Sequence, residues 1–222
     1  MTAVPVVIGV RAPDAAAASG AVPTTGALVD THGRVHRDLR ISLTDRCSLR
    51  CTYCMPEQGN EWLARTSILT TDEIVEVAEV AASLGIRTFR LTGGEPLVRE
   101  DLHKLVRLIA SIAGIRDVGL TPNGVLLADQ AAEVFDSGVR RLHVSLDTLG
   151  EARFRGLTRR DGLDRVLAGL DAAKAAGFDP IKVNAVAIRG VTDVDAVPLA
   201  RYARDHGFEL RFIEYMPIGA DP

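Results

Sequence analysis

RCSLRCTYC, residues 46–54, holds the only three cysteines of the chain, Cys47, Cys51 and Cys54, in the spacing C-x3-C-x2-C. A structural zinc site takes four ligands in a closed tetrahedron. Each of the four irons in a cubane iron–sulfur cluster takes one ligand, usually a Cys thiolate. Three thiolates therefore leave one iron open to a small molecule, as catalytic zinc sites keep one position open. The spacing also allows a zinc site completed by a histidine, or three buried thiols.

A second motif, RLTGGEPLVRE at residues 90–100, lies at the end of a predicted strand. Its glycine pair, Gly93 and Gly94, lets the backbone approach a ligand closely, and Pro96 fixes the exit of the turn. Glu95 is an acceptor that could hold a ligand ammonium group. Strand ends carry the chemistry of α/β barrels, although the same residues also suit an ordinary tight turn.

Length and composition are those of one large domain. The chain has 222 residues, of which 47% are hydrophobic, with a net charge of −3 and a pI near 6.0. This charge gives no whole-chain electrostatic basis for binding nucleic acid or a membrane. No apolar run reaches the roughly 18 residues of a membrane span, and the N-terminus lacks a signal-peptide pattern. We therefore expect a cytoplasmic protein, in a reducing compartment that suits thiolate ligands.

Residues 1–30 differ in kind from the rest of the chain. Within them, the run AAAASGAVPTTG is built from small residues, contains Pro and Gly, and has no periodicity. We predict a disordered or loosely docked lead-in over residues 1–30, followed by a single barrel domain over residues 31–222.

From Asp38 onward, short β-rich runs alternate with helical patterns. Thr70 and Glu73 form a capping box that begins the first helix. Glycines follow the helical patterns at Gly85, Gly114, Gly138, Gly177 and Gly207. Six strands are predicted, at residues 39–44, 88–92, 117–121, 141–146, 181–188 and 209–216. This rhythm is typical of a parallel α/β fold, and six strands are too few to close an eight-stranded barrel.

Alternation along these strands separates an apolar row, which should face the helices, from a polar row that faces the barrel interior. The polar row contains Arg40, Arg90 and Lys182, together with His143, the one histidine predicted to point inward. Buried cations are costly without partners. They either pair with interior carboxylates such as Glu214, or line a wet cavity for a strongly anionic ligand such as a phosphate.

The motifs and their flanking segments resemble the radical S-adenosylmethionine (SAM) superfamily, and within it the molybdenum-cofactor biosynthesis protein A branch, the GTP 3′,8-cyclases. The resemblance runs from about Asp38 to Met216. The cysteine triplet is specific to the superfamily. The segments DLRISLTDRCSLRCTYCMP, RLTGGEPLVR, GLTPNG, HVSLDT, IKVNAV and RFIEYMP, in this order, are specific to the branch. The resemblance implies a partial, open (β/α)6 TIM-like barrel of the radical SAM type.

The resemblance also implies roles for the matched residues. The catalytic residues and ligands of one [4Fe–4S] cluster would be Cys47, Cys51 and Cys54. The contacts with SAM would be Tyr53, Gly94, Glu95, Ser145 and Met216. The contacts with substrate would be Arg40, Arg90, Thr121 and Lys182. Asn123 and Gly124, in TPNG, are predicted to shape a turn.

The implied activity is that of a lyase. SAM bound at the open iron is cleaved reductively to a 5′-deoxyadenosyl radical, which takes a hydrogen from the GTP ribose at C3′. The ribose carbon then attacks C8 of guanine, giving (8S)-3′,8-cyclo-7,8-dihydroguanosine 5′-triphosphate in the first step of molybdenum cofactor biosynthesis. The implied partners are an electron donor, the downstream cyclic pyranopterin monophosphate synthase and a second copy in a homodimer, with neither nucleic acid nor membrane.

The sequence departs from this family at its C-terminal end. The family carries a second cysteine triplet, for a cluster that helps to bind guanine, followed by a Gly-Gly tail, and this sequence has neither. We expect either a fragment or a shortened, catalytically incomplete form in which GTP recognition is most affected. Two further interpretations stay open: a radical SAM enzyme acting on another substrate such as a peptide, and a zinc-binding or inactive scaffold.

Overall fold

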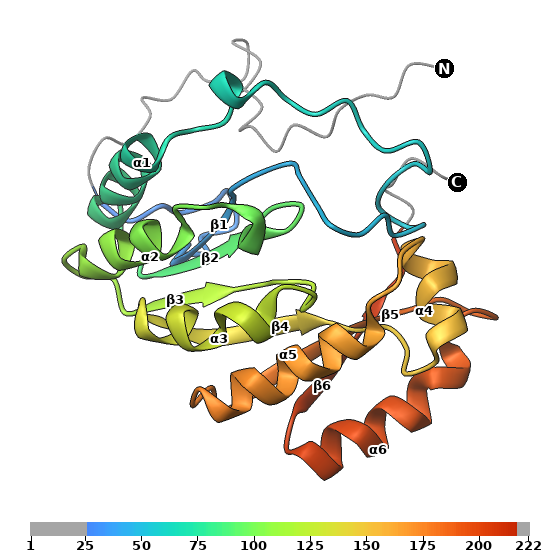
Figure 1. The fold of residues 1–222 in the computed structure, drawn as a ribbon. Coiled ribbons are helices and arrows are strands. Elements are labelled where there is room, and N and C mark those ends of the chain that lie inside the picture. Colours follow the sequence, from blue (N-terminus) through green and yellow to red (C-terminus); the bar gives the residue numbers. More distant parts are fainter. Residues whose placement is uncertain (1–25, 217–222) are drawn as a thin grey trace.

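The structure is a computed structural model that describes residues 26–216, and it contains one parallel sheet of six strands. The strands lie in chain order, so β1 and β6 are the two edges and the barrel is open (Figure 1). The bounds are β1 (Asp38–Ser42), β2 (Thr88–Thr92), β3 (Asp117–Leu120), β4 (Val139–Ser145), β5 (Ile181–Ala187) and β6 (Glu209–Glu214). The six predicted strands and the open α/β barrel are confirmed, with every strand boundary within two residues of its prediction.

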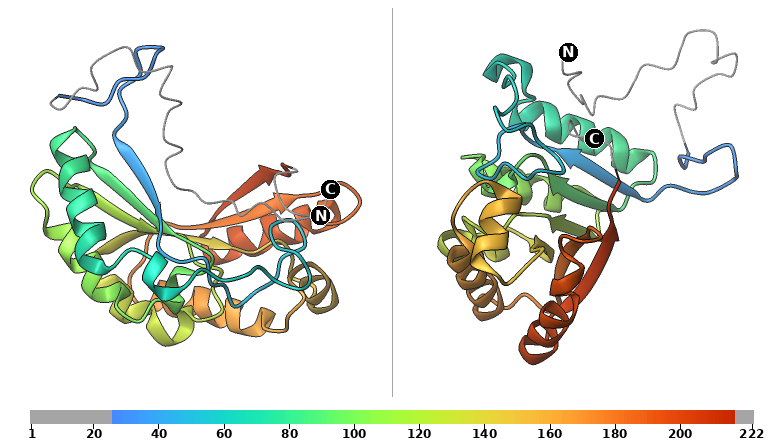
Figure 2. Two further views of the ribbon diagram at one scale, coloured as in Figure 1. Left: turned by 90° about the horizontal axis from the view of Figure 1, so that it is seen from above. Right: turned by 90° about the vertical axis from the view of Figure 1, so that its right-hand side faces the viewer.

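Helices follow the strands, and α2, α3 and α5 lie on the convex side of the curved sheet (Figure 2). The bounds are α1 (Thr71–Ser83), α2 (Leu102–Ser111), α3 (Leu127–Asp136), α4 (Glu151–Thr158), α5 (Leu163–Ala175) and α6 (Ala196–His206). The predicted capping box is present: the Thr70 side chain accepts from the Glu73 amide, and the Glu73 carboxylate accepts from the Thr70 amide. Three short 3-10 helices, η1 (Arg65–Ser67), η2 (Pro96–Val98) and η3 (Asp193–Asp195), complete the elements.

The hydrophobic core lies between the sheet and the helices. Phe89 and Leu91 of β2, Leu120 of β3, and Leu142 and Val144 of β4 are all fully buried. They belong to one continuous cluster with the inner faces of the helices. The predicted apolar rows therefore face the helices, which leaves the polar rows on the opposite, concave face of the sheet.

Close packing between α5 and the turn after β3 depends on one glycine. A Cβ built on Gly169 of α5 would lie 2.6 Å from the carbonyl oxygen of Gly124. Only glycine allows the backbone of the helix to come this near, because every other residue would place a carbon inside that contact. The helix thereby holds the TPNG turn against the end of the sheet.

The described chain begins with a small antiparallel turn beside α1. Val29 and Val35 form an isolated bridge, and the Leu28 amide donates to the Leu84 carbonyl at 3.1 Å. The predicted boundary at residue 30 falls inside this turn. The disorder predicted for the lead-in concerns mainly residues 1–25, which lie outside the described residues. Between residues 26 and 216, no helix is both long enough and apolar enough to cross a membrane.

Replacing Phe89 tests the core. The ring is fully buried between β2 and the helices, so Phe89→Ala should lower the free energy of unfolding by about 3–5 kcal/mol. Phe212→Ala is the matched control, because that ring lies on edge strand β6 and is 49% exposed. Urea unfolding measures both variants. Equal, small losses in the two would contradict the described packing.

Candidate functional site

The loop that carries the three cysteines follows β1. Buried side chains and backbone hydrogen bonds hold it to the barrel. The side chains of Leu49 and Met55 are buried. The amides of Arg50 and Thr52 donate to the carbonyls of Thr158 and Leu157, at 2.9 and 2.8 Å, at the end of α4. Core burial and these two hydrogen bonds fasten the loop to the barrel.

The three thiols lie at one cavity. Cys47, Cys51 and Cys54 all line a space of about 230 Å³ at the carboxyl ends of β2, β3 and β4. None of the three forms a disulfide. Burial raises the pKa of the Cys47 thiol. Hydrogen bonding between Cys51 and Cys54 raises the pKa of Cys51 and lowers that of Cys54.

The glycine turn forms the adjoining wall. The Gly94 amide donates to the Thr44 carbonyl at 2.7 Å, and the Glu95 amide donates to the Arg46 carbonyl at 2.7 Å. A Cβ on Gly94 would overlap the backbone of Arg46, so this position requires glycine. Gly93 and Gly94 line the cavity together with the three thiols.

Three further predicted residues reach the same cavity: Tyr53, Thr121 and Ser145 line it. The Tyr53 hydroxyl donates to Asp147 Oδ2 at 2.6 Å, and the Val186 amide donates to Asp147 Oδ1 at 2.7 Å. Burial raises the pKa of both Tyr53 and Asp147. Asp147 thus joins the cysteine loop to the ends of β4 and β5.

Glu95 and Met216 do not line this cavity. Glu95 is fully buried behind the turn, where its oxygens accept from the amides of Leu97 at 3.0 Å and Asn123 at 2.6 Å. Its carboxylate therefore supports the backbone that borders the cavity. The Met216 side chain is 58% exposed beyond β6. The predicted contact of each with SAM stays a prediction.

A second group of charged side chains lies on the concave face, beside the first cavity. A small cavity there is lined by Arg90, Arg141 and His143 together with Thr121, which also lines the cysteine cavity. His143 is buried as predicted. Burial, followed by the positive charges of Lys182, Arg90, Arg211 and Arg141, lowers its pKa to about 4. The imidazole is therefore neutral near pH 7.

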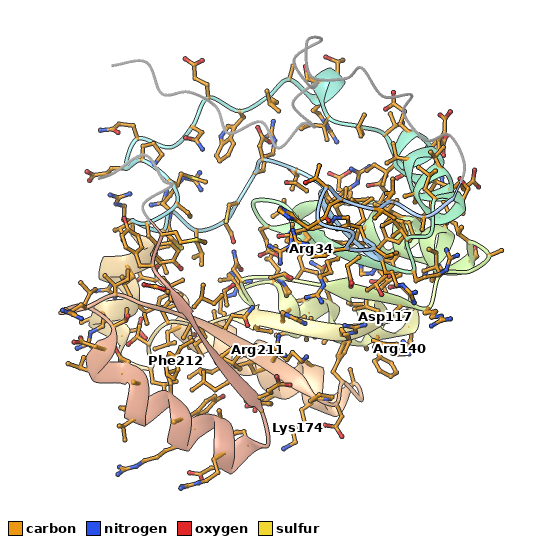
Figure 3. The ribbon with its side chains drawn as sticks, turned by 180° about the vertical axis from the view of Figure 1, so that it is seen from behind. Arg34, Asp117, Arg140, Lys174, Arg211 and Phe212 are labelled. Atoms are coloured by element: carbon orange, nitrogen blue, oxygen red, sulfur yellow. The ribbon has the colours of Figure 1, made fainter. Side chains whose placement is uncertain are left out.

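Carboxylates near the strand starts pair with part of this charge. Asp38 lies 3.8 Å from Arg90, and Glu209 lies 3.6 Å from Lys182 and 2.6 Å from Arg211. Asp117 pairs with Arg141. Figure 3 labels Arg211 on β6 and Asp117 on β3 and views the sheet from the side away from α2, α3 and α5.

Glu214 is not a partner of these cations among residues 26–216, where it is exposed and forms no ion pair with them. Arg90 and Lys182 therefore pair with partly exposed carboxylates near the strand starts, and not with Glu214. Arg40 is exposed and lines neither cavity, although it is in register with Arg90 on β2.

The sequence prediction missed two cations of this face. Arg141 lies two residues before His143 on β4, so the period of two that placed His143 could also have found it. Arg211 of β6 lies in register with Asn184 of β5, so the same period of two could have placed it on this face. Asp147 carried no comparable signal, because its bond to Tyr53 spans 94 residues.

The three cysteine thiols are chemically suited to hold an iron–sulfur cluster. Thiolates are the ligands that such clusters take, and the three cysteines border one cavity. Among residues 26–216, no three His, Cys, Asp or Glu side chains are grouped around a point as ligands of a single metal ion.

Comparison with known proteins gives a consistent assignment. The family model described as the radical SAM superfamily matches residues 41–203. A GTP 3′,8-cyclase of Rhodopirellula baltica is 51% identical over 196 residues, which are 88% of this chain and 55% of that protein. A GTP 3′,8-cyclase of Paenarthrobacter nicotinovorans is 49% identical over 195 residues, with 87% and 55% covered. The chain thus spans about half the length of these relatives.

Solved structures share the fold. SuiB of Streptococcus suis, bound to S-adenosylmethionine, matches with a TM-score of 0.70 and 18% identity, over 83% of this chain and 42% of that one. Methylornithine synthase matches with a TM-score of 0.64 and 20% identity, over 81% and 53%. At these identities the likeness concerns the fold alone.

The buried carboxyl of Glu95 predicts a pH dependence of stability. Burial raises its pKa from 4.5 to about 7, so between these values the folded protein keeps a proton that the unfolded chain has released. Its contribution to stability is complete below about pH 4.5 and is lost as the pH rises through about 7. In Glu95→Gln, the wild-type-minus-variant difference in unfolding free energy should fall with a slope of up to about 1.4 kcal/mol per pH unit.

Urea unfolding of both proteins across this pH range measures that difference. Glu100→Gln is the control, because Glu100 is an exposed carboxylate on the same segment. Curves for wild type and Glu95→Gln that run parallel across the range would contradict the raised pKa of the buried Glu95 carboxyl.

Proposed function

Because the chain belongs to the radical SAM superfamily, we propose that it acts as a lyase on GTP, in the GTP 3′,8-cyclase reaction. The product would be (8S)-3′,8-cyclo-7,8-dihydroguanosine 5′-triphosphate, the first intermediate of molybdenum cofactor biosynthesis. Two relatives named GTP 3′,8-cyclase are 51% and 49% identical to the chain in sequence. The observation that carries the proposal is the cationic concave face that adjoins the cysteine cavity through Thr121.

Cys47, Cys51 and Cys54 would hold one [4Fe–4S] cluster. When bound, the cluster and SAM supply a 5′-deoxyadenosyl radical. The thiols must release their protons to bind iron, and the burial that raises the pKa of Cys47 favours its protonated thiol. The hydrogen bonds from Arg50 and Thr52 to the end of α4 fasten the loop that carries the three thiols.

Gly94, Tyr53 and Ser145 would contact SAM from three sides of the cavity. Gly94 brings backbone rather than side chain to the ligand, and the Tyr53–Asp147 bond keeps the tyrosine ring at the wall. Glu95 would act by holding the backbone of the turn from behind. Contact between Met216 and the adenine ring would need the segment after β6 to fold toward the cavity.

The concave face would bind the triphosphate. Arg90 and Lys182 have carboxylate partners at 3.8 and 3.6 Å, and ion pairs of this partly exposed kind are weak. A triphosphate offers more negative charge than these carboxylates and can take guanidinium donors bidentately. Arg40, in register with Arg90, would contact a phosphate that extends past β2. Such a surface favours a nucleotide over a peptide substrate.

The remaining expectations concern partners and location. An electron donor would reduce the cluster, and cyclic pyranopterin monophosphate synthase would take the product. A homodimer and a cytoplasmic location also follow from the proposed family role, and three free cysteines suit a reducing compartment.

Removing the cations should weaken GTP binding. Arg90→Ala and Lys182→Ala should each raise the Kd for GTP by about tenfold or more, because each loses a charge-assisted hydrogen bond. Arg165→Ala is the control, since Arg165 is half exposed on α5, on the opposite side of the sheet. Isothermal titration of the reconstituted protein measures the three. Undiminished binding in both Arg90→Ala and Lys182→Ala would overturn the assignment of the substrate face.

Removing one thiol should abolish the radical chemistry. Cys51→Ser is expected to lose the cluster and with it the reductive cleavage of SAM, because a serine hydroxyl is a poor ligand for iron–sulfur clusters. Iron and sulfide analysis and chromatography of 5′-deoxyadenosine measure the two effects. A Cys51→Ser protein that still cleaves SAM would remove Cys51 from the ligand set.

A further inference from the structure

Asn123 makes more contacts than a turn residue needs. Its Oδ1 accepts from the Val125 amide at 3.0 Å, which confirms the predicted turn. Its Nδ2 is not used by that turn. The Nδ2 group donates to Ser48 Oγ at 3.0 Å and lies 3.6 Å from Cys47 Sγ, within hydrogen-bond reach of sulfur. An amide after β3 thus contacts the loop after β1, although these two strands are not neighbours.

Glu95 fixes the position of this amide. The Asn123 backbone amide donates to Glu95 Oε2 at 2.6 Å, and the other carboxylate oxygen holds the Leu97 amide. Glu95 is fully buried and Asn123 is 8% exposed. On the other side of the turn, α5 packs against Gly124 through Gly169. The Asn123 side chain therefore points at Cys47 from a rigid support.

Cys47 differs from the other two thiols in its surroundings. Besides the Asn123 amide, its sulfur accepts from the Leu49 backbone amide at 3.4 Å. Cys51 and Cys54 interact with each other. An N–H group directed at a cluster thiolate places a partial positive charge beside the sulfur, and this charge stabilises the form of the cluster that carries the extra electron. In a buried site this effect is stronger than in water.

We propose that Asn123 is a positioning residue for the cluster, which orients Cys47 and raises the reduction potential of the cluster through an N–H···S hydrogen bond. The proposal rests on the proposed function in one respect, that Cys47 is a cluster ligand. Glu95 serves the same purpose indirectly, by holding the Asn123 backbone. The GGEP and TPNG motifs thereby act as one unit. The buried Glu95 carboxylate of the first motif holds Asn123 of the second, and Asn123 contacts Cys47.

The test is the midpoint potential of the cluster in the reconstituted full chain, followed by electron paramagnetic resonance during an anaerobic redox titration. Asn123→Ser keeps a hydroxyl that can accept from the Val125 amide and removes the amide N–H donor without adding a charge beside the cluster, and Asn123→Leu removes both acceptor and donor. Each should lower the reduced-to-oxidised ratio at a fixed potential by about tenfold, which is about 59 mV for one electron. Ser48→Ala is the control, because it removes the other partner of Nδ2 and leaves the bond to sulfur.

An unchanged midpoint in both Asn123 variants would overturn the proposal, as would a shift in Ser48→Ala as large as theirs. If Asn123→Leu fails to fold, as judged by circular dichroism, Asn123→Ser decides the question because it keeps an acceptor for the turn and adds no charge. Failure of the wild-type chain to take up a cluster would overturn the proposed function and this inference together. A normal cluster in wild type with unchanged variants would overturn the inference alone.

Discussion

Two backbone hydrogen bonds determine where everything else in the site lies. The amides of Gly94 and Glu95 donate to the carbonyls of Thr44 and Arg46, and so continue the β1–β2 pairing past the ends of the strands. This continuation brings the loop with three cysteines against the glycine turn, with no room for a side chain at Gly94. The thiols and the turn then share one cavity, and the strand ends that follow supply its remaining walls.

Local patterns predicted the framework of this site well. The period of two along the strands placed Phe89 and Leu91 toward the helices and Arg90 and His143 on the other face, because alternation is a property of the strand itself. The capping box at Thr70 was equally local. Helix α4, Glu151–Thr158, was not predicted, since Phe154 and Leu157 are the only apolar side chains that it buries and eight residues give little periodicity.

What the sequence could not show depends on contacts between distant segments. The resemblance gave Glu95 a contact with SAM, which stays a prediction, but it did not show that the carboxylate accepts from the backbone amide of Asn123, 28 residues further along the chain. The sequence predicted only a turn at Asn123. Its contact with Cys47 could not be predicted, because it joins loops that follow two strands that do not pair. The ion pairs at Asp38 and Glu209 likewise follow from strand register, which motif recognition does not supply.

The central claim is that a cation-lined surface and a radical-generating cavity act on one substrate. The direct test is anaerobic: the chain is reconstituted with iron and sulfide, given SAM and a strong reductant, and 5′-deoxyadenosine is quantified with and without GTP. The account predicts that GTP stimulates formation of 5′-deoxyadenosine, because Thr121 lines both cavities and a nucleotide bound at the cationic face would lie beside the cysteine cavity. Formation at the same rate with and without GTP, in protein carrying a full cluster, would contradict it.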